Sequence, residues 1–173
     1  EWRIVNIEYF TLDHKQGFYT NAEYSNNGVK LIRISDLHNP KINYDTMPLL
    51  ELDEKTIKQF SVSIGDVLLA RTGAAIGTYG IVNSNMNCIF GSYLIRFTFD
   101  RKKVLSTFFG YFYESNLFKK QQHVIRQGSS NVNINAENIK SLNFLLPSIL
   151  EQQKIISILY DIDKHITQQQ SHL

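Results

Sequence analysis

The last stretch of the chain, residues 148–173, has the hydrophobic spacing of a helix that packs against another helix. Ser148 and Glu151, placed directly after Pro147, form the pattern of a capping box at a helix start. Apolar residues then recur at steps of four and three, which is typical of a coiled-coil seam. The predicted seam consists of Ile155, Leu159, Ile162 and Ile166. Because no other predicted helix has a matching seam, we expect this helix to protrude and to pair outside these residues.

Residues 1–147 combine short strand patterns with two helical patterns. Alternation or short apolar runs predict strands at residues 2–7, 29–34, 66–71, 78–82, 88–99 and 143–146. Helical spacing predicts a main helix over residues 103–125 and a short helix over 136–142. The order lacks regular strand–helix–strand alternation, which favours an α+β fold: a mixed, mainly antiparallel sheet with a packed helix, followed by one long coiled-coil-like helix. We therefore divide the chain into a domain of residues 1–147 and a helix of residues 148–173.

Composition limits the class of protein. Of 173 residues, 43% are hydrophobic, and 11 Phe with 9 Tyr argue for a packed core rather than disorder. A single cysteine, Cys88, excludes an internal disulfide framework and a cysteine-based zinc site. The net charge of +2 permits nucleic-acid binding without indicating it. With no long apolar run and no signal-peptide pattern, we expect no membrane contact and a cytoplasmic location.

Patterns of known active sites are missing from the sequence. It contains no dinucleotide-binding glycine motif, no Walker loop and no nucleophile elbow. The histidines are scattered singly: His14, His38, His123, His165 and His172. The densest acidic cluster, within residues 45–54, has no basic residue at a nuclease-like spacing, which favours a solvated loop over a metal site. We expect no catalytic residue, no metal site and no cofactor.

Two polar segments are candidates for binding. At Arg71-Thr72-Gly73 a predicted strand ends in a glycine-rich corner, where backbone can approach a ligand closely and an arginine can reach a guanine edge or a phosphate. The polar loop that begins at Arg126 contains side chains able to bond bases bidentately. An ordinary glycine turn with a solvated arginine, and a plain solvated connection, remain the alternative interpretations.

These features in this order resemble the specificity (S) subunit of type I restriction-modification systems. The resemblance spans nearly the whole chain, from Trp2 to the final helix. Its most specific part is Pro147 with Glu151-Gln152 at the start of a helix that later contains Leu159 and Asp163. The other matching segments are residues 65–73 with Gly77, and Gln127-Gly128 followed by Asn138-Ile139.

The resemblance implies a non-catalytic, DNA-reading function. In this family two target-recognition domains, each followed by a conserved helix, read the two halves of a split duplex target in the major groove. The two helices pack antiparallel as a spacer and dock two methyltransferase (modification) subunits, to which restriction subunits attach. Methyl transfer and ATP-driven cleavage belong to those partners, so this chain is expected to need no cofactor.

The family resemblance places DNA-contacting residues in loops. We expect the first contacts from the corner, at Arg71, Thr72 and Gly73, and from the polar loop, at Arg126, Gln127, Ser129 and Asn131. Lys30, Arg33 and Tyr79 are secondary candidates.

The chain carries one recognition domain and one helix, half of the usual S subunit. We expect it to be either a fragment or a half-size subunit that dimerises through the helix and reads a palindromic split site. The main competing hypothesis is an assembly module whose helix recruits a partner without DNA reading. A third, an unrecognised nuclease or methyltransferase, lacks a supporting motif.

Overall fold

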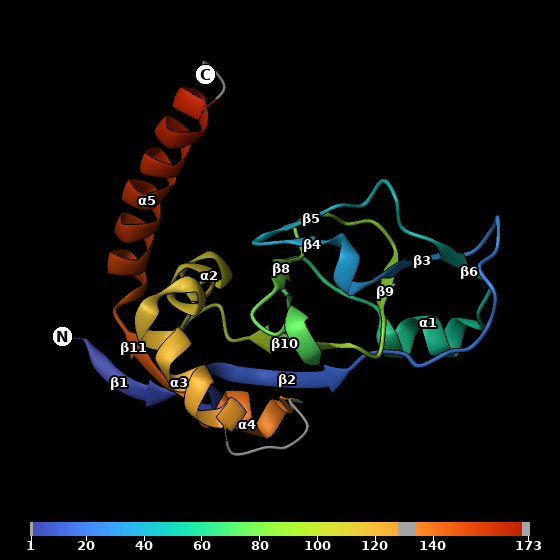
Figure 1. Cartoon of the computed structure of the whole chain (residues 1–173), viewed down its shortest axis with the longest axis horizontal. Coiled ribbons are helices and arrows are strands. Elements are labelled where there is room, and N and C mark those ends of the chain that lie inside the picture. The colour runs from blue at the N-terminus through green and yellow to red at the C-terminus, as the bar shows by residue number, and fades with distance from the viewer. Residues whose placement is uncertain (1, 128–133, 171–173) are drawn as a thin grey trace.

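The computed structural model describes residues 2–127 and 134–170. Its strands are β1 (Arg3–Asn6), β2 (Thr11–Gln16), β3 (Val29–Ile32), β4 (Leu37–His38), β5 (Lys41–Ile42), β6 (Leu49–Leu50), β7 (Val67–Ala70), β8 (Tyr79–Ile81), β9 (Cys88–Phe90), β10 (Leu94–Phe99) and β11 (Asn143–Leu146). The α-helices are α1 (Glu54–Phe60), α2 (Ser106–Glu114), α3 (Asn116–Gln127), α4 (Ala136–Lys140) and α5 (Ile149–Gln170). Short 3₁₀ turns are η1 (Ile7–Phe10), η2 (Ile34–Asp36) and η3 (Gly73–Ala75). In Figure 1, α5 stands away from the body that the other elements form.

The central sheet has the strand order β2-β10-β7-β8, with every neighbouring pair antiparallel. A second sheet has the order β6-β3-β9 and contains the parallel pair β3–β9, while β1–β11 and β4–β5 form separate antiparallel pairs. The predicted α+β class with mainly antiparallel pairing is therefore confirmed, although the strands are distributed over several small sheets.

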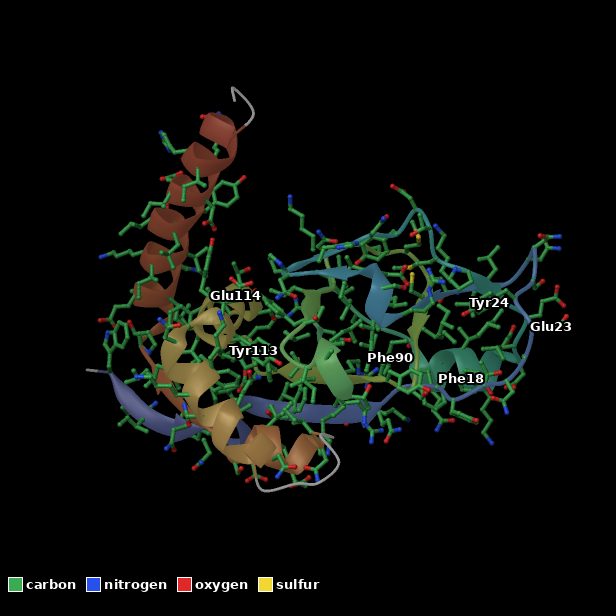
Figure 2. All side chains as sticks on the ribbon, in the orientation of Figure 1. Phe18, Glu23, Tyr24, Phe90, Tyr113 and Glu114 are labelled. Atoms are coloured by element: carbon green, nitrogen blue, oxygen red, sulfur yellow. The ribbon has the colours of Figure 1, made fainter. Side chains whose placement is uncertain are left out.

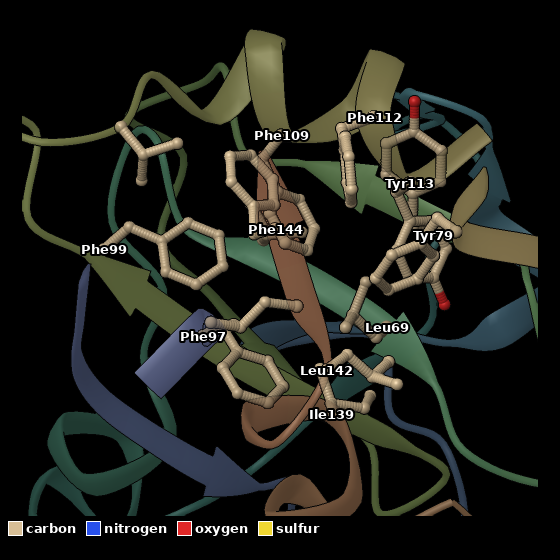
Figure 3. Packing of buried hydrophobic residues seen from close by; sticks show 14 of the residues in the cluster. Leu69, Tyr79, Phe97, Phe99, Phe109, Phe112, Tyr113, Ile139, Leu142 and Phe144 are labelled. Carbon is tan, nitrogen blue, oxygen red and sulfur yellow. The ribbon is translucent and has the colours of Figure 1, made fainter. Parts of the chain in front are cut away.

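An aromatic core lies between the central sheet and the helices. Figure 3 shows Phe109 and Phe144 at its centre, and their rings are stacked with centroids 6.0 Å apart and planes 7° apart. Phe112 lies 4.3 Å from Phe144 by ring centroids, and Phe10 meets the same ring edge-on at 4.9 Å. Burial of several large rings contributes most of the hydrophobic stabilisation in a domain of this size.

Two elements that the sequence predicted as continuous are each divided in the structure. The predicted helix over 103–125 is two helices, because Ser115 adopts an extended backbone conformation between α2 and α3. The Ser115 hydroxyl bonds the carbonyl of Phe112 at 2.6 Å and accepts from the N–H of Phe118 at 3.3 Å, as a helix-capping serine does. The predicted strand over 88–99 is divided by a turn at 91–93, so that β9 and β10 join different sheets.

The base of α5 is fixed to the domain. The predicted capping box is present: the backbone N–H of Ser148 donates to the Glu151 carboxylate at 2.9 Å, and the N–H of Glu151 donates to the Ser148 hydroxyl at 3.3 Å. Gln152 is fully buried, and its amide bonds backbone groups of the segment before α2. Ile155 and Ile156 also pack on the aromatic core.

The part of α5 beyond Leu159 is exposed. Within the predicted seam, Ile155 packs on the core of the domain and Leu159 is half-buried. Ile162 and Ile166 are 50% and 49% exposed. Ile158, 61% exposed, extends this apolar row toward the domain. In the described part of the chain, no helix has both the length and the hydropathy of a membrane span.

Candidate nucleic-acid interface

The corner after β7 is an open backbone turn. Gly73 and Gly77 have φ angles of +58° and +104°, in the left-handed region that glycine adopts without strain. A Cβ added to either glycine would meet no heavy atom within 4 Å. The N–H of Ala70 donates to the carbonyl of Thr78 at 3.0 Å, which closes the corner at its base. Gly73 is exposed and Thr72 half-exposed, so both the backbone and the Thr72 side chain are accessible to a ligand.

Arg71 lies where three segments of the chain meet. Its backbone N–H donates to the carbonyl of Tyr93 at 3.1 Å, and its own carbonyl accepts from the N–H of Ile134 at 2.9 Å. Ile134 is the first described residue after the predicted polar loop. Ile134, far from Arg71 in sequence, is therefore held against the glycine corner.

The polar loop is only partly within the described residues. Arg126 and Gln127 belong to the last turn of α3, so the prediction that a loop begins at Arg126 is wrong. Ser129 and Asn131, the other two predicted contacts of this loop, lie outside the described residues.

Tyr79 is not a surface residue, so its prediction as a DNA contact is wrong. Its side chain is 2% exposed and lies in the core against Tyr113, with ring centroids 5.2 Å apart (Figure 3). Burial, followed by the nearby Glu114 carboxylate, raises the pKa of Tyr79 above its ordinary value. Alternation in β8 turns this ring inward, which the short strand pattern alone did not reveal.

Lys30 and Arg33 hold the fold locally. The Lys30 ammonium donates to the carbonyl of Tyr44 at 2.7 Å. The Arg33 guanidinium bonds the buried carboxylate of Asp36 through Nε at 3.1 Å and Nη2 at 2.9 Å. Hydrogen bonds to Asp36, and after them to Tyr24, raise the pKa of Arg33. Arg33 keeps a third of its side chain exposed in a fixed orientation, whereas Lys30 serves mainly to tie β3 to residue 44.

A groove lies beside the corner and was not predicted from the sequence. Three tyrosines border it, Tyr19, Tyr24 and Tyr93, with exposures of 69%, 59% and 63%. The groove has a volume of about 490 Å³, and Arg33 lies among its lining residues. Tyr93 is more than 60 residues from Tyr19 and Tyr24 in sequence, so no local motif marks the groove.

Two acidic residues of 45–54, Glu51 and Asp53, have structural partners. The Asp53 carboxylate caps α1 by accepting from the backbone N–H of Thr56 at 2.8 Å and from its hydroxyl at 2.7 Å, and these bonds lower the pKa of Asp53. Glu51 accepts from the hydroxyl of Ser25 at 2.8 Å. Across the described residues, no group of three or more His, Cys, Asp or Glu side chains is arranged to hold a metal ion.

Known proteins with similar sequences are specificity subunits. Over 171 residues the chain is 25% identical to the type I restriction enzyme MjaVIII specificity subunit of Methanocaldococcus jannaschii, covering 96% of the chain and 40% of that protein. It is 24% identical over 162 residues to the StySPI specificity subunit of Salmonella potsdam, covering 90% of the chain and 35% of that protein. The chain thus spans well under half the length of these relatives.

Solved structures share the fold at low sequence identity. A chain from a structure concerning complex assembly and conformational transition of the type I R-M system superposes with a TM-score of 0.77 at 15% identity, covering 99% of this chain and 40% of that one. The HsdS subunit of Thermoanaerobacter tengcongensis superposes with a TM-score of 0.69 at 16% identity, covering 96% of this chain and 38% of that one. These likenesses support the fold assignment.

The family assignment rests on nearly the whole chain. Residues 1–172 match the family described as the type I restriction modification DNA specificity domain. This match confirms the resemblance found in the sequence and the prediction of a specificity domain rather than a catalytic subunit. The chain belongs to the type I restriction modification DNA specificity domain family.

Proposed function

We propose that this chain reads one half of a split duplex DNA target and, through α5, docks the methyltransferase subunits of a type I system. The observation that carries the proposal is the hydrogen bond of 2.9 Å between the N–H of Ile134 and the carbonyl of Arg71. It ties Ile134, which follows the predicted polar segment in sequence, to the glycine corner. In a chain of this family, the corner offers a cation, an exposed glycine backbone and a hydroxyl group, which are groups that bind phosphates and base edges.

The corner and α5 have different roles: the corner contacts DNA, and α5 packs against a partner helix. Arg71, Thr72 and Gly73 supply DNA contacts, with Arg126, Gln127, Ser129 and Asn131 in the neighbouring segment. The exposed row Ile158, Ile162 and Ile166 supplies a helix-packing face. We place the boundary between recognition domain and spacer helix at residues 147–148, although Gln152 and Ile155 still pack on the domain.

The second half of the target requires a second recognition unit. The chain spans 40% of one specificity subunit and 35% of another, which fits one recognition domain and one helix. A second domain in the same polypeptide, or a second copy joined through α5, would supply the other half-target. A symmetric pair would repeat one half-site in inverted order. Methyl transfer and cleavage would belong to the partner subunits, and DNA as the ligand implies a cytoplasmic location.

A selection from a randomised duplex library tests the DNA-reading proposal. We expect the chain, with a methyltransferase subunit of the same system, to enrich a short motif, and its affinity to fall with salt at a log–log slope of about −5 if about six phosphates are contacted. Arg71→Ala should weaken binding, whereas Arg3→Ala removes an equal charge on β1, away from the corner. A folded complex that enriches no motif would support the assembly-module alternative.

A further inference from the structure

The groove beside the corner is formed where two segments cross at very short distance. Gly17 directly follows β2, and a Cβ at this position would clash with the carbonyl oxygen of Gly91. The N–H of Phe18 donates to the carbonyl of Phe90 at 2.8 Å, and the N–H of Gly17 donates to the carbonyl of Leu94 at 3.0 Å. Residues 19–24 form an irregular connection that is bonded to strands at both ends, because the N–H of Ser25 also donates to the carbonyl of Leu49 at 2.9 Å. The two ends of this groove wall are therefore anchored on the sheets.

Exposed aromatic rings line this groove, which we call the tyrosine groove. Tyr19 and Tyr24 line it from the segment that follows β2, and Tyr93 lines it from the turn that precedes β10. All three are more than half exposed, although each ring has a large apolar face. Aromatic side chains gathered on a surface in this way are enriched at binding sites, because they combine apolar contact with a hydroxyl group. Figure 2 shows Tyr24 and Glu23 at the end of the molecule farthest from α5.

Arg33 gives the groove a fixed donor. Its guanidinium is oriented by the buried Asp36 carboxylate and by the carbonyl of Thr46, which accepts from Nη2 at 3.1 Å. An arginine held in this way loses little side-chain entropy when it binds a base edge or a phosphate. The hydroxyl and amide side chains of Thr20, Asn21, Ser35 and Ser92 complete the polar lining. Glu23 is exposed in the same segment but does not line the groove.

The tyrosine groove adjoins the glycine corner. The hydrogen bond of 3.1 Å from the N–H of Arg71 to the carbonyl of Tyr93 joins the two directly. A duplex seated on the corner would therefore extend toward Tyr93. This proximity to the corner, together with an arginine and neutral hydrogen-bonding groups in the lining, favours DNA over a peptide as the occupant.

We propose that the tyrosine groove is a second DNA-contacting region, which discriminates base pairs at the edge of the half-target next to those contacted by the corner. The tyrosine rings pack on apolar base features such as the thymine methyl group, and Arg33 donates to a base edge or a phosphate. This inference rests on the proposed DNA-reading function. It assigns DNA contacts to Tyr19, Tyr24 and Tyr93.

Comparing base preferences among variants tests the groove. The complex of the chain with its methyltransferase subunit is selected on random duplexes and then titrated with the enriched target and with each single-base-pair variant of it. We expect Tyr93→Ala and Tyr24→Ala to lower discrimination at one or two positions by about five- to tenfold, the low end of a specific base contact. Tyr160→Ala, an equally exposed tyrosine on α5, should leave every preference unchanged.

The outcomes separate the groove from the corner. Tyr93→Phe keeps the ring and loses only the hydroxyl, so it should retain a preference that depends on apolar contact. If wild type enriches a motif and Arg71→Ala weakens it, while the tyrosine variants keep both affinity and base preference, the groove inference is overturned alone. If the tyrosine variants instead lose the methyltransferase subunit with DNA preference unchanged, the groove binds protein and the inference also fails. If wild type enriches nothing, the DNA-reading proposal itself fails.

Discussion

The Gln152 side-chain oxygen accepts a hydrogen bond from the backbone N–H of Leu105 at 2.9 Å, joining the first turn of α5 to the residue that precedes α2. The Gln152 amide nitrogen donates to the carbonyls of Lys103 at 2.8 Å and Pro147 at 3.0 Å. One fully buried side chain therefore satisfies three backbone groups and sets the direction in which α5 leaves the domain.

Gln152→Ala should lower the free energy of unfolding by about 2–4 kcal/mol, because it leaves buried backbone groups without partners and opens a cavity. Urea denaturation measures the change. Gln153→Ala, at the adjacent exposed position, is the matched control and should stay within about 0.5 kcal/mol of wild type. Equal effects of the two substitutions would show that the buried amide does not fix α5.

Gly17→Ala should destabilise the domain by about 2 kcal/mol or more, because the new methyl group would clash with the Gly91 carbonyl oxygen and the backbone there must shift. Gly73→Ala places its methyl group in open space, so it should lower the free energy of unfolding only by the strain of a left-handed backbone, about 1 kcal/mol. Thermal and urea unfolding of the two variants distinguishes them. A Gly17 variant as stable as wild type would contradict the close crossing that forms the tyrosine groove.

Ile162→Asp with Ile166→Asp should abolish self-association or methyltransferase docking, because both side chains are about half exposed on the free part of α5. The free energy of unfolding should change little, since neither side chain is buried in the domain. Size-exclusion chromatography with light scattering gives the mass, and Ser157→Asp, an exposed polar position on the same helix, is the control. Unchanged mass together with unchanged docking would refute this use of the exposed row.

Stability should fall at alkaline pH because of Tyr113. Burial raises the pKa of this phenol to about 12, whereas an unfolded tyrosine has a pKa of about 10. Below about pH 10 the Tyr113 phenol is protonated in both the folded and the unfolded chain, so its contribution to stability is fully present. Between about pH 10 and pH 12 the phenol loses its proton in the unfolded chain first, so the free energy of unfolding decreases. Tyr113→Phe should flatten this dependence. A slope identical to that of wild type across this range would be the contrary result.

Local signals were readable from the sequence, and long-range ones were not. Ser148 and Glu151 predicted a capping box correctly because both partners lie within one helical turn. The role of Gln152 depends on Leu105, 47 residues away in sequence, and nothing near Gln152 indicates it. Ser115 was missed as a helix boundary because the apolar stripe continues across it. The pattern there reports which face is buried, and not whether the backbone is continuous.

The candidate site was predictable only in its glycine corner. The sequence placed Arg71, Thr72 and Gly73 on an accessible turn, because glycine at a strand end is a strong local signal. Tyr79 was misassigned because its strand of three residues is too short for alternation to indicate the buried side. Tyr19, Tyr24 and Tyr93 come together only through the crossing at Gly17 and Gly91, which depends on tertiary contacts.

Selection of bound duplexes with wild type, Arg71→Ala and Arg3→Ala, each with the methyltransferase subunit, tests the central claim most directly. We predict that wild type and Arg3→Ala enrich the same short motif, inverted and spaced if two copies assemble through α5. Arg71→Ala should bind that motif at least about fivefold more weakly, the loss expected for one charged contact. Enrichment of the same motif with equal affinity by all three proteins would contradict the role of the corner, and no enrichment by the folded wild-type complex would contradict DNA reading by this chain.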